Sequence, residues 1–526
     1  MTQQQRMILA LALSFIFFMV YESLMPKPQI ADLNQTKANS QLVKKTKTIN
    51  NTSAPQIDTT TSQSTINHTK STNTLHQSQL STVKSKDFFA KIDSLGRISF
   101  FELRDKKFET KDGTYPALIN QESKLLPLEI RFTDEKVNEE AFKTPYIADT
   151  KELIVDSNPN TITLTQNLSD LTVQKIITFE PNGHYNLEIK LSKDIPYFIT
   201  NGTRPIADTD RYTFNGTLVK KADGKLDTIA EGDAEESLRY NGANFVASSN
   251  KYYTTLFYDF QNGLPVVIDH DKDENPLPFV KGSNNFKVNA YIGPKEYETL
   301  KSIDPKLTDV IEYGFFTFIS KPLFLALKYI HNLVGNWGWA IVIITILLRL
   351  ILYPLTFKGM VSMNKMKELS PKVNEIRQKY KSEPQKMNAK MMELYKKHGA
   401  NPMGGCLPML LQIPVFFAIY RVLLNAVELK HAPWIGWIQD LSVMDPYYIL
   451  PILMGATMYW QQRLTPSNFT DPMQEKIMKF LPLIFTFFFV TFPAGLTLYW
   501  FVNNLFSVAQ QYYVNSIFDK QRKAKA

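Results

Sequence analysis

Two patterns of hydrophobic and polar positions divide the chain. Between residues 87 and 308, apolar residues alternate with polar residues in short runs such as 185–191, and turn signals such as the Pro-Asn-Gly of 181–183 separate these runs. Alternation with a period of two is typical of half-buried strands in antiparallel sheets. The sequence therefore predicts a large all-β domain over residues 87–308.

After residue 336 the alternation gives way to long apolar stretches. Residues 337–357 are apolar over the roughly 20 positions that a membrane-spanning helix needs. Four more apolar stretches follow, at residues 405–427, 447–462, 479–493 and 496–514. Together with an apolar N-terminal segment, these stretches predict a polytopic α-helical membrane protein with six transmembrane helices.

The N-terminal segment precedes a long polar region. Residues 7–20 are apolar and follow Arg6, as in the core of a signal peptide, but no small-x-small cleavage motif comes after them. We interpret residues 1–25 as an uncleaved signal-anchor helix. Residues 26–86 are rich in Ser, Thr, Asn, Gln and Lys and cannot bury enough apolar surface to fold, so they predict a flexible tether.

Residues 309–335 are compatible with a further span or with an amphipathic helix on the membrane surface, because they are apolar but carry Lys321 and Lys328. The loop at 358–403 decides between the two. It carries eleven basic and four acidic residues, net +7, and the positive-inside rule places such a loop in the cytoplasm. With a cytoplasmic N-terminus, this requires an interfacial helix at 309–335. The all-β domain is then periplasmic, and the basic tail at 516–526 is cytoplasmic.

The basic segment 358–403 also has the signals of a helical hairpin. Ser370, followed by a proline, is typical of a helix start, and Gly399 is typical of a helix stop. Met387 and Met391 occupy apolar positions of the second arm. Such methionines either fill the seam between the two helices or form an adaptable docking surface, and the sequence leaves both interpretations open.

One charge interrupts the apolar stretch 337–357. At helical rise, Arg349 lies roughly 18 Å from Trp337 and roughly 12 Å from Phe357, too deep to reach either membrane surface easily. A central arginine costs about 2.5–3.5 kcal/mol on insertion scales. Thr345 lies one turn earlier on the same helix face. We interpret Arg349 as the centre of a polar groove inside the membrane; the alternative is an arginine that snorkels to the headgroups or pairs within a helix bundle.

A polar stripe in the last apolar stretch supports this interpretation. Its members recur at helical spacing and are Trp500, Asn503, Asn504, Ser507 and Gln511. Together with Gln412, Thr345 and Arg349 they predict the lining of one hydrophilic groove. The stretch 479–493 reaches only about 22 Å as a helix, less than the roughly 30 Å of hydrocarbon, which predicts local thinning of the bilayer.

Composition excludes several other classes of function. The chain has 526 residues and a net charge of +9, and Cys406 is its single cysteine, which rules out intrachain disulfides and multi-cysteine metal sites. There is no phosphate-binding G-x-x-x-x-G-K-[ST] motif. The acidic run 269–274 lacks the glycine and the final glutamate of a calcium loop. We therefore predict no catalytic residues, no metal and no cofactor, and a protein that is not an enzyme.

Four motifs in the C-terminal part are longer and more specific than any of these signals. They are RLILYPLT at 349–356, NPMGGCLPMLLQIP at 401–414, TDPMQEKIM at 470–478, and PAGLTLYW at 493–500 followed by Asn503 and Asn504. In this order and spacing they closely resemble the YidC/Oxa/Alb family of membrane protein insertases, of the Gram-negative YidC type. Relatives often have a second tyrosine at the position of Trp500.

The resemblance implies a structure for each part of the chain. It implies a five-helix insertase core at 336–515 around a groove that contains Arg349 and Thr345, and a periplasmic β-supersandwich. It also implies that the substrate helix contacts four apolar residues in the third, fourth and fifth spans. These residues are Ile413, Phe416, Met454 and Phe488.

The function implied by the resemblance is that of an insertase and chaperone for integral proteins of the Gram-negative inner membrane. It implies as partners nascent membrane proteins, the Sec translocon and membrane lipids. The basic hairpin and tail would face the ribosome or the signal-recognition targeting machinery, although lipid headgroups explain their charge equally well; we expect no DNA binding.

Two rival functions come from other classes. One is a membrane transporter or channel that uses Arg349 as an anion site. The sequence has no recognisable inverted repeats, which argues against this function. The other is an anchored sugar-binding or enzymatic sheet domain. That second function does not account for the apolar stretches after residue 336, because a single anchor would suffice.

Overall fold

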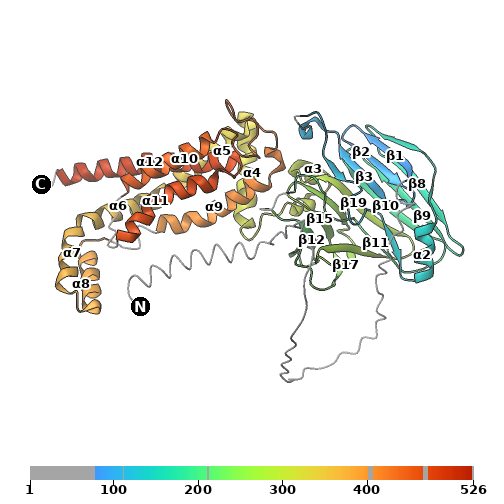
Figure 1. Ribbon diagram of the computed structural model, residues 1–526, viewed down its shortest axis with the longest axis horizontal. Helices are drawn as coiled ribbons and strands as arrows, with labels where there is room; N and C mark the ends of the chain where they lie inside the picture. The colour runs from blue at the N-terminus through green and yellow to red at the C-terminus, as the bar shows by residue number, and fades with distance from the viewer. Residues whose placement is uncertain (1–77, 111, 210–212, 401–406, 466–471, 524–526) are drawn as a thin grey trace, which may run out of the picture. The chain divides into compact units, whose positions relative to one another are not determined.

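The computed structural model describes residues 78–523 apart from 111, 210–212, 401–406 and 466–471, and divides the chain into two compact units, Met1–Pro294 and Lys295–Ala526 (Figure 1). The predicted anchor at 1–25, most of the predicted tether and Cys406 lie outside the described residues. The first described strand begins at Gln79, inside the range predicted as tether. The unit boundary at Pro294 comes before the predicted end of the β domain at residue 308.

The first unit is an all-β domain, as the alternating pattern predicts. Its strands are β1 (Gln79–Ser85), β2 (Phe88–Asp93), β3 (Ile98–Leu103), β4 (Ala117–Ile119), β5 (Ile130–Phe132), β6 (Ile147–Ala148), β7 (Glu152–Val155), β8 (Asn160–Asn167), β9 (Thr172–Phe179), β10 (His184–Leu191), β11 (Tyr197–Ile199), β12 (Gly216–Lys220), β13 (Leu226–Ala230), β14 (Leu238–Ala243), β15 (Phe245–Ser249), β16 (Tyr253–Tyr258), β17 (Leu264–His270), β18 (Pro276–Gly282) and β19 (Phe286–Pro294). A short 3-10 helix, η1 (Lys106–Phe108), and one α-helix, α2 (Glu135–Lys143), join them.

These strands form three sheets. The largest has nine strands in the order β13-β12-β15-β16-β19-β10-β9-β8-β6, and the two five-stranded sheets have the orders β4-β3-β2-β1-β7 and β14-β17-β18-β11-β5. The described strand pairs are antiparallel except for β1 with β7. In β10, Leu187 is buried and pairs with Ile177 of β9 and Val288 of β19, whereas Asn186 is exposed. The predicted two-residue alternation is confirmed in this strand.

The predicted turn at 181–183 joins β9 to β10. Gly183 adopts φ of +87°, a left-handed conformation that favours glycine. A Cβ at this position would also collide with the carbonyl oxygen of Ile292 in β19. Glycine is therefore required here both by the backbone conformation and by the approach of the neighbouring strand.

Lys175 lies where the three sheets meet. It belongs to β9 of the nine-stranded sheet and has no exposed surface. Its Nζ atom donates to the carbonyl oxygen of Gly96 at 2.9 Å, in the turn between β2 and β3, and to that of Leu128 at 2.8 Å, just before β5. The ring of Tyr146 lies 4.5 Å from the same nitrogen. One side chain thus connects segments from all three sheets.

We expect the stability of the β domain to rise with pH because of this lysine. Burial lowers the pKa of Lys175 from 10.5 to about 7. Between these two values the unfolded chain binds more protons than the folded chain, so unfolding becomes less favourable as the pH rises, by about 1.4 kcal/mol per unit at most. Chemical unfolding at pH 7, 8 and 9 should show this slope in the natural protein and a flatter one in Lys175→Met. An equal slope in both proteins would contradict the assignment.

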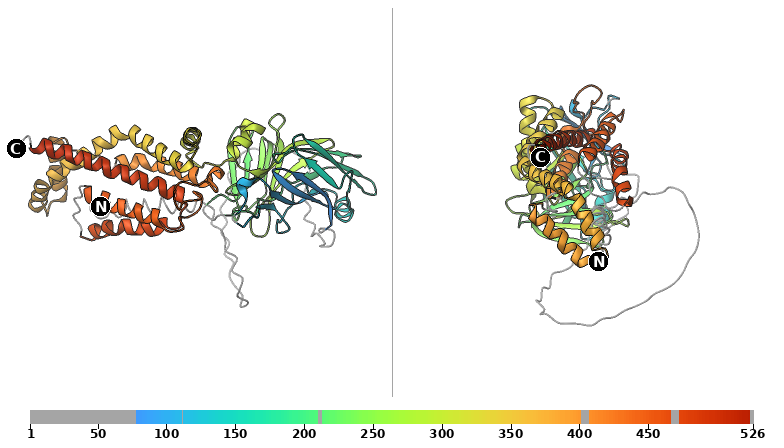
Figure 2. Two further views of the ribbon diagram at one scale, coloured as in Figure 1. Left: turned by 90° about the horizontal axis from the view of Figure 1, so that it is seen from above. Right: turned by 90° about the vertical axis from the view of Figure 1, so that its left-hand side faces the viewer.

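The second unit is helical. Its elements are α3 (Tyr297–Ile303), the 3-10 helix η2 (Pro305–Val310), α4 (Thr317–Val334), α5 (Trp337–Ile351), α6 (Tyr353–Glu368), α7 (Ser370–Lys379), α8 (Pro384–Lys397), α9 (Leu407–Asn425), the 3-10 helix η4 (Val427–Leu429), α10 (Ile449–Leu464), α11 (Pro472–Phe489) and α12 (Ala494–Lys523). The long helix α12 packs against α5, α6 and α10, and α4 packs against α5 and α9 (Figure 2). Helix α12 continues well into the predicted tail at 516–526.

The prediction of a single helix over 337–357 is wrong. The chain bends by 63° between α5, which ends at Ile351, and α6, which begins at Tyr353. Pro354 explains the break, because it has no N–H to continue the helical hydrogen bonds and, in a continuous helix, its ring would collide with the carbonyl oxygen of Leu350 four residues earlier. Helix α6 then runs to Glu368, so the predicted hairpin segment 358–403 begins inside a helix.

In the part of the chain that the structure describes, no helix taken singly has the length and hydropathy of a membrane span. The bent pair α5 and α6 meets these criteria when the two helices are taken together. The predicted helices after residue 404 are confirmed as α9 to α12, whereas the number of transmembrane helices stays a prediction.

Helices α7 and α8 form the predicted hairpin, and three methionines fill the seam, whereas Met392 is 56% exposed. Met391 is buried in a cluster with Leu369 and Val373, and Met387 and Met366 pack against this cluster. Of the two interpretations that the sequence left open, the structure supports the seam for these residues. Lysines cover the outside of the hairpin.

Helix α4 has one face buried in the helical unit, and its exposed face is also largely apolar. Phe324 and Leu327 are buried against neighbouring helices, whereas Phe318, Tyr329 and Leu333 are each more than 60% exposed. An exposed apolar stripe of this kind is typical of a surface that meets lipid or a partner.

Candidate functional site

Two of the predicted groove residues meet at the contact between α5 and α12. Arg349 lies near the end of α5, and its Nε atom donates to the Oδ1 atom of Asn503 on α12 at 2.6 Å. Arg349 is 8% exposed and Asn503 is 5% exposed. Two residues that are far apart in the sequence are thus joined inside the helical unit, a contact that fits both the groove and the alternative of an arginine paired within a helix bundle.

Thr345 and Ser507 lie in the same buried region but make no bond across the helix pair. The hydroxyl of Thr345 donates to the carbonyl oxygen of Ile341 at 2.6 Å, and the hydroxyl of Ser507 donates to that of Asn503 at 2.9 Å. Each hydroxyl therefore satisfies a backbone group of its own helix. They make the buried region less apolar without pairing with Arg349.

Trp500 lies in an aromatic cluster. Its ring is 4.6 Å from that of Phe416 on α9 and 5.1 Å from that of Phe489 on α11, measured between centroids. Its Nε1 atom and the Nδ2 atom of Asn504 are buried and have no hydrogen-bond partner among the described residues. Both atoms are hydrogen-bond donors, so this end of the site can donate to oxygen atoms of another molecule or of water. Gln412 lies half-buried on α9.

The four residues implied as substrate contacts have different exposures. Ile413 and Phe416 are half-buried on α9. Met454 on α10 is fully buried, whereas Phe488 on α11 is 46% exposed. Of these four residues, Phe416 contacts a predicted groove residue, because its ring packs against that of Trp500.

Several polar residues beyond the predicted set extend this region toward α6. Gln510 donates to the hydroxyl of Thr356 at 2.5 Å. Asn515 accepts a hydrogen bond from Asn364 at 3.0 Å and donates to the carbonyl oxygen of Leu464 at 3.1 Å. Asn515 continues the spacing of four residues that begins at Asn503, so helical periodicity could have identified it as part of the polar stripe. Its partner Asn364 was missed because it lies in the segment predicted as a cytoplasmic hairpin.

The charge of Arg349 has no counter-charge in the described part of the chain, where its recorded side-chain partner is the neutral Asn503. Burying a charge is costly unless it is paired or reached by water. Arg421 on α9 differs in this respect, because its Nη1 atom lies 3.5 Å from a carboxylate oxygen of Glu312. Arg349 therefore offers a positive charge to an outside acceptor, and Arg421 does not.

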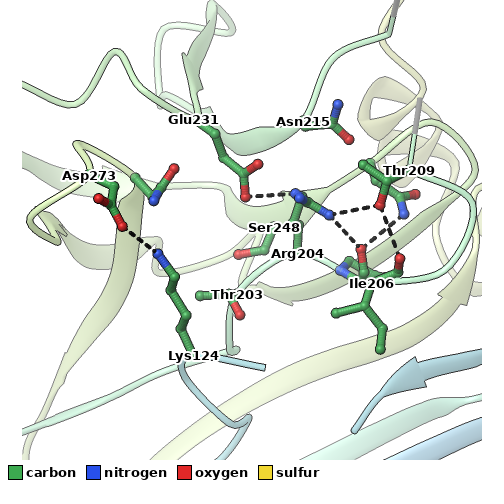
Figure 3. Close-up of polar contacts among 12 residues, drawn as sticks. Lys124, Thr203, Arg204, Ile206, Thr209, Asn215, Glu231, Ser248 and Asp273 are labelled. Atoms are coloured by element: carbon green, nitrogen blue, oxygen red, sulfur yellow. Dashed lines mark hydrogen bonds and ion pairs between the residues drawn. The ribbon is translucent and has the colours of Figure 1, made fainter. Parts of the chain in front are cut away.

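A separate cavity of about 210 Å³ lies in the β domain (Figure 3). Its two cations already have partners: Arg204 Nε lies 2.6 Å from Glu231 Oε1, and Lys124 Nζ lies 2.6 Å from Asp271 and 3.2 Å from Asp273. These ion pairs connect loops and include two acidic residues from the run at 269–274. Nowhere in the described residues do three or more His, Cys, Asp or Glu side chains come together as metal ligands.

Comparisons with known proteins agree with the division into two units. The family model described as "YidC periplasmic domain" matches residues 80–326, and the model described as "60Kd inner membrane protein" matches residues 329–522. The membrane protein insertase YidC of Campylobacter jejuni subsp. jejuni is 53% identical over 99% of this chain and 98% of its own length. The chain belongs to the YidC family of membrane protein insertases. A second YidC, from Wolinella succinogenes, is 49% identical over 99% of this chain and 97% of its own length.

A solved structure of an active YidC insertase covers 84% of this chain and 96% of its own chain, at 20% identity and a TM-score of 0.37. Within the YidC family the candidate site described above belongs to the part matched as an inner membrane protein. The paired charges around Lys124 and Arg204 belong to the part matched as a periplasmic domain.

Proposed function

We propose that this YidC-family protein inserts proteins into the inner membrane through a polar groove centred on Arg349. One observation carries the proposal: a buried arginine in an apolar stretch of α5, held by a neutral asparagine, has no counter-charge in the described part of the chain. The family relationship supports it, because the relatives that match over the full length are named membrane protein insertases.

The physical task of such a protein is to move a polar segment across hydrocarbon. Each backbone group that lacks a partner there costs several kcal/mol. Buried donors and acceptors with unused capacity, on Trp500, Asn504 and Gln510, shorten the apolar distance that the segment must cross. Arg349 attracts acidic residues of the segment, and the apolar helix of the substrate then leaves into lipid. The residues along its exit would be Ile413, Phe416, Met454 and Phe488.

The chain supplies binding and hydration, and the substrate supplies the driving force. Partition of an apolar helix into lipid is favourable, and the membrane potential contributes about 2.3 kcal/mol per charge at 100 mV. We infer six transmembrane helices, both termini in the cytoplasm, the β domain in the periplasm and α4 at the interface. No catalytic residue, cofactor or metal takes part, and the protein acts as an insertase and chaperone rather than as an enzyme.

The proposed partners follow from the same surfaces. Nascent membrane proteins enter the groove, and the lipid-facing helices are available to the Sec translocon. Lys372, Lys379 and Lys396 are exposed on α7 and α8. A basic surface of this kind suits the ribosome or the targeting machinery at low salt and anionic lipid headgroups equally well.

Reconstitution tests the proposed function. Full-length protein in liposomes is mixed with a newly synthesised single-span substrate that has an acidic outward tail, and insertion is measured as protection of the tail from added protease. We expect insertion well above that of protein-free liposomes, without any nucleotide. Insertion that equals the protein-free control, or a chloride conductance without insertion, would favour the transporter interpretation instead.

A further inference from the structure

We propose that Asn503 is a positioning residue that fixes how Arg349 presents its charge to a substrate, an inference that rests on the proposed insertase function. The two side chains come from different helices, and their contact is short: Arg349 Nε donates to Asn503 Oδ1 at 2.6 Å. Both side chains are more than nine-tenths buried. A short bond between two buried side chains restricts the rotation of the guanidinium group.

The bond occupies one edge of that group. A carboxylate can pair with a guanidinium group either along the edge that includes Nε or end-on, across the two terminal nitrogens. Because Asn503 holds Nε, the end-on arrangement is the one that still gives both carboxylate oxygens a donor. Asn503 therefore selects the direction from which an acidic group can reach Arg349.

The neutrality of Asn503 matters as much as its position. An aspartate at this position would hold Nε equally well, but it would neutralise the arginine before any substrate arrived. A leucine of similar size would leave the charge but would supply no acceptor. An asparagine accepts a charge-assisted hydrogen bond and keeps the full positive charge available.

The surroundings on α12 fit the same ligand chemistry. Trp500 Nε1 and Asn504 Nδ2 are buried donors without partners among the described residues, and both lie within one turn of Asn503. Ser507 binds the backbone carbonyl of Asn503, which leaves the Asn503 side chain to Arg349. A site that combines these donors with the terminal nitrogens of Arg349 favours carboxylate oxygens of a substrate tail.

The test compares two substrates that differ in the tail alone, one with acidic residues and one with Asn and Gln in their place. The ratio of their insertion rates in proteoliposomes is measured for the natural protein, Asn503→Leu, Asn503→Asp and Arg349→Ala. We expect Asn503→Leu to lower the acidic-to-neutral ratio by roughly tenfold, the value of one charge-assisted hydrogen bond. Asn503→Asp should lower the ratio to that of Arg349→Ala, while insertion of the neutral tail persists.

A structural role for Asn503 would not produce the coupling that we expect with Arg349. In an Arg349→Ala background, Asn503→Leu should leave the ratio unchanged, because the residue acts through the arginine. Asn425→Leu is the matched control, since it removes a buried amide on α9 that donates to the carbonyl oxygen of Glu312 and lies outside the proposed site, and its effect should be the same in both backgrounds. If Asn503→Leu lowers the ratio equally with and without Arg349, or if neither Asn503 variant changes it, the inference is overturned.

The design separates this inference from the proposed function. If the natural protein inserts neither substrate, the proposed function fails. If it inserts both and the Asn503 variants keep its ratio, the positioning role alone fails. Asn503→Asp retains a polar side chain of the same size, so it remains informative if Asn503→Leu proves too unstable to reconstitute.

Discussion

Replacing Arg349 with alanine is expected to slow the insertion of a substrate with an acidic tail by about ten- to a hundredfold. The variant loses the hydrogen bonds between a guanidinium group and a carboxylate, which contribute about 1.5–3 kcal/mol each. It also leaves the Oδ1 atom of Asn503 without its recorded donor. Arg349→Lys keeps the charge but loses the planar fork, so it should restore part of the rate. Insertion rates measured in proteoliposomes should therefore fall in the order natural protein, Arg349→Lys, Arg349→Ala.

Arg421 supplies the matched control for this prediction. It is another arginine in an apolar helix of the unit, but it pairs with Glu312. Arg421→Ala should change stability without lowering insertion of the acidic tail relative to a neutral tail. If Arg349→Ala inserts both tails at the natural rate, then Arg349 has a structural role, and the groove would have to act by hydration and bilayer thinning alone.

The sequence predicts the elements of this protein better than their ends. Alternation predicts β10 because one face of that strand is buried and the other is exposed. The hydropathy of 337–357 conceals the break at Leu352, because the average over a window does not register one missing N–H. Pro354 carries that information, and the steric and hydrogen-bonding rule for proline inside a helix finds the break that hydropathy misses.

The candidate site was predictable as a set of residues and only partly as a set of contacts. The depth of Arg349 and the helical spacing of Asn503 identify both residues. Their hydrogen bond could not be derived, because a spacing along one helix does not say which helix packs against it. The same limit hid the contact between Gln510 and Thr356, whose helices are adjacent in the fold but far apart in the chain.

Arg97→Met is expected to destabilise the β domain by about 3–5 kcal/mol, because it leaves the buried carboxylate of Asp93 without its ion-pair partner and leaves Glu129 with Arg131 alone. Arg97 is 3% exposed and lies between β2 and β3. Its Nε atom donates to Asp93 at 2.9 Å, and its Nη1 atom lies 2.8 Å from a carboxylate oxygen of Glu129. Asp93 ends a strand of one five-stranded sheet, and Glu129 precedes a strand of the other. The variant therefore weakens the junction between two sheets as well as one ion pair.

The control is Arg104→Met, which removes an arginine that pairs with Glu102 at 2.7 Å but is 46% exposed. Water screens such a pair, so the loss should stay below about 1 kcal/mol. Urea unfolding of the full-length protein, followed by a signal from the β domain, compares the two variants. Adding Asp93→Asn to Arg97→Met should restore part of the lost stability, because it removes the buried negative charge that has lost its ion-pair partner. Equal losses for Arg97→Met and Arg104→Met would show that the junction does not depend on buried charge pairing, and the sheets would then be held by their apolar contacts alone.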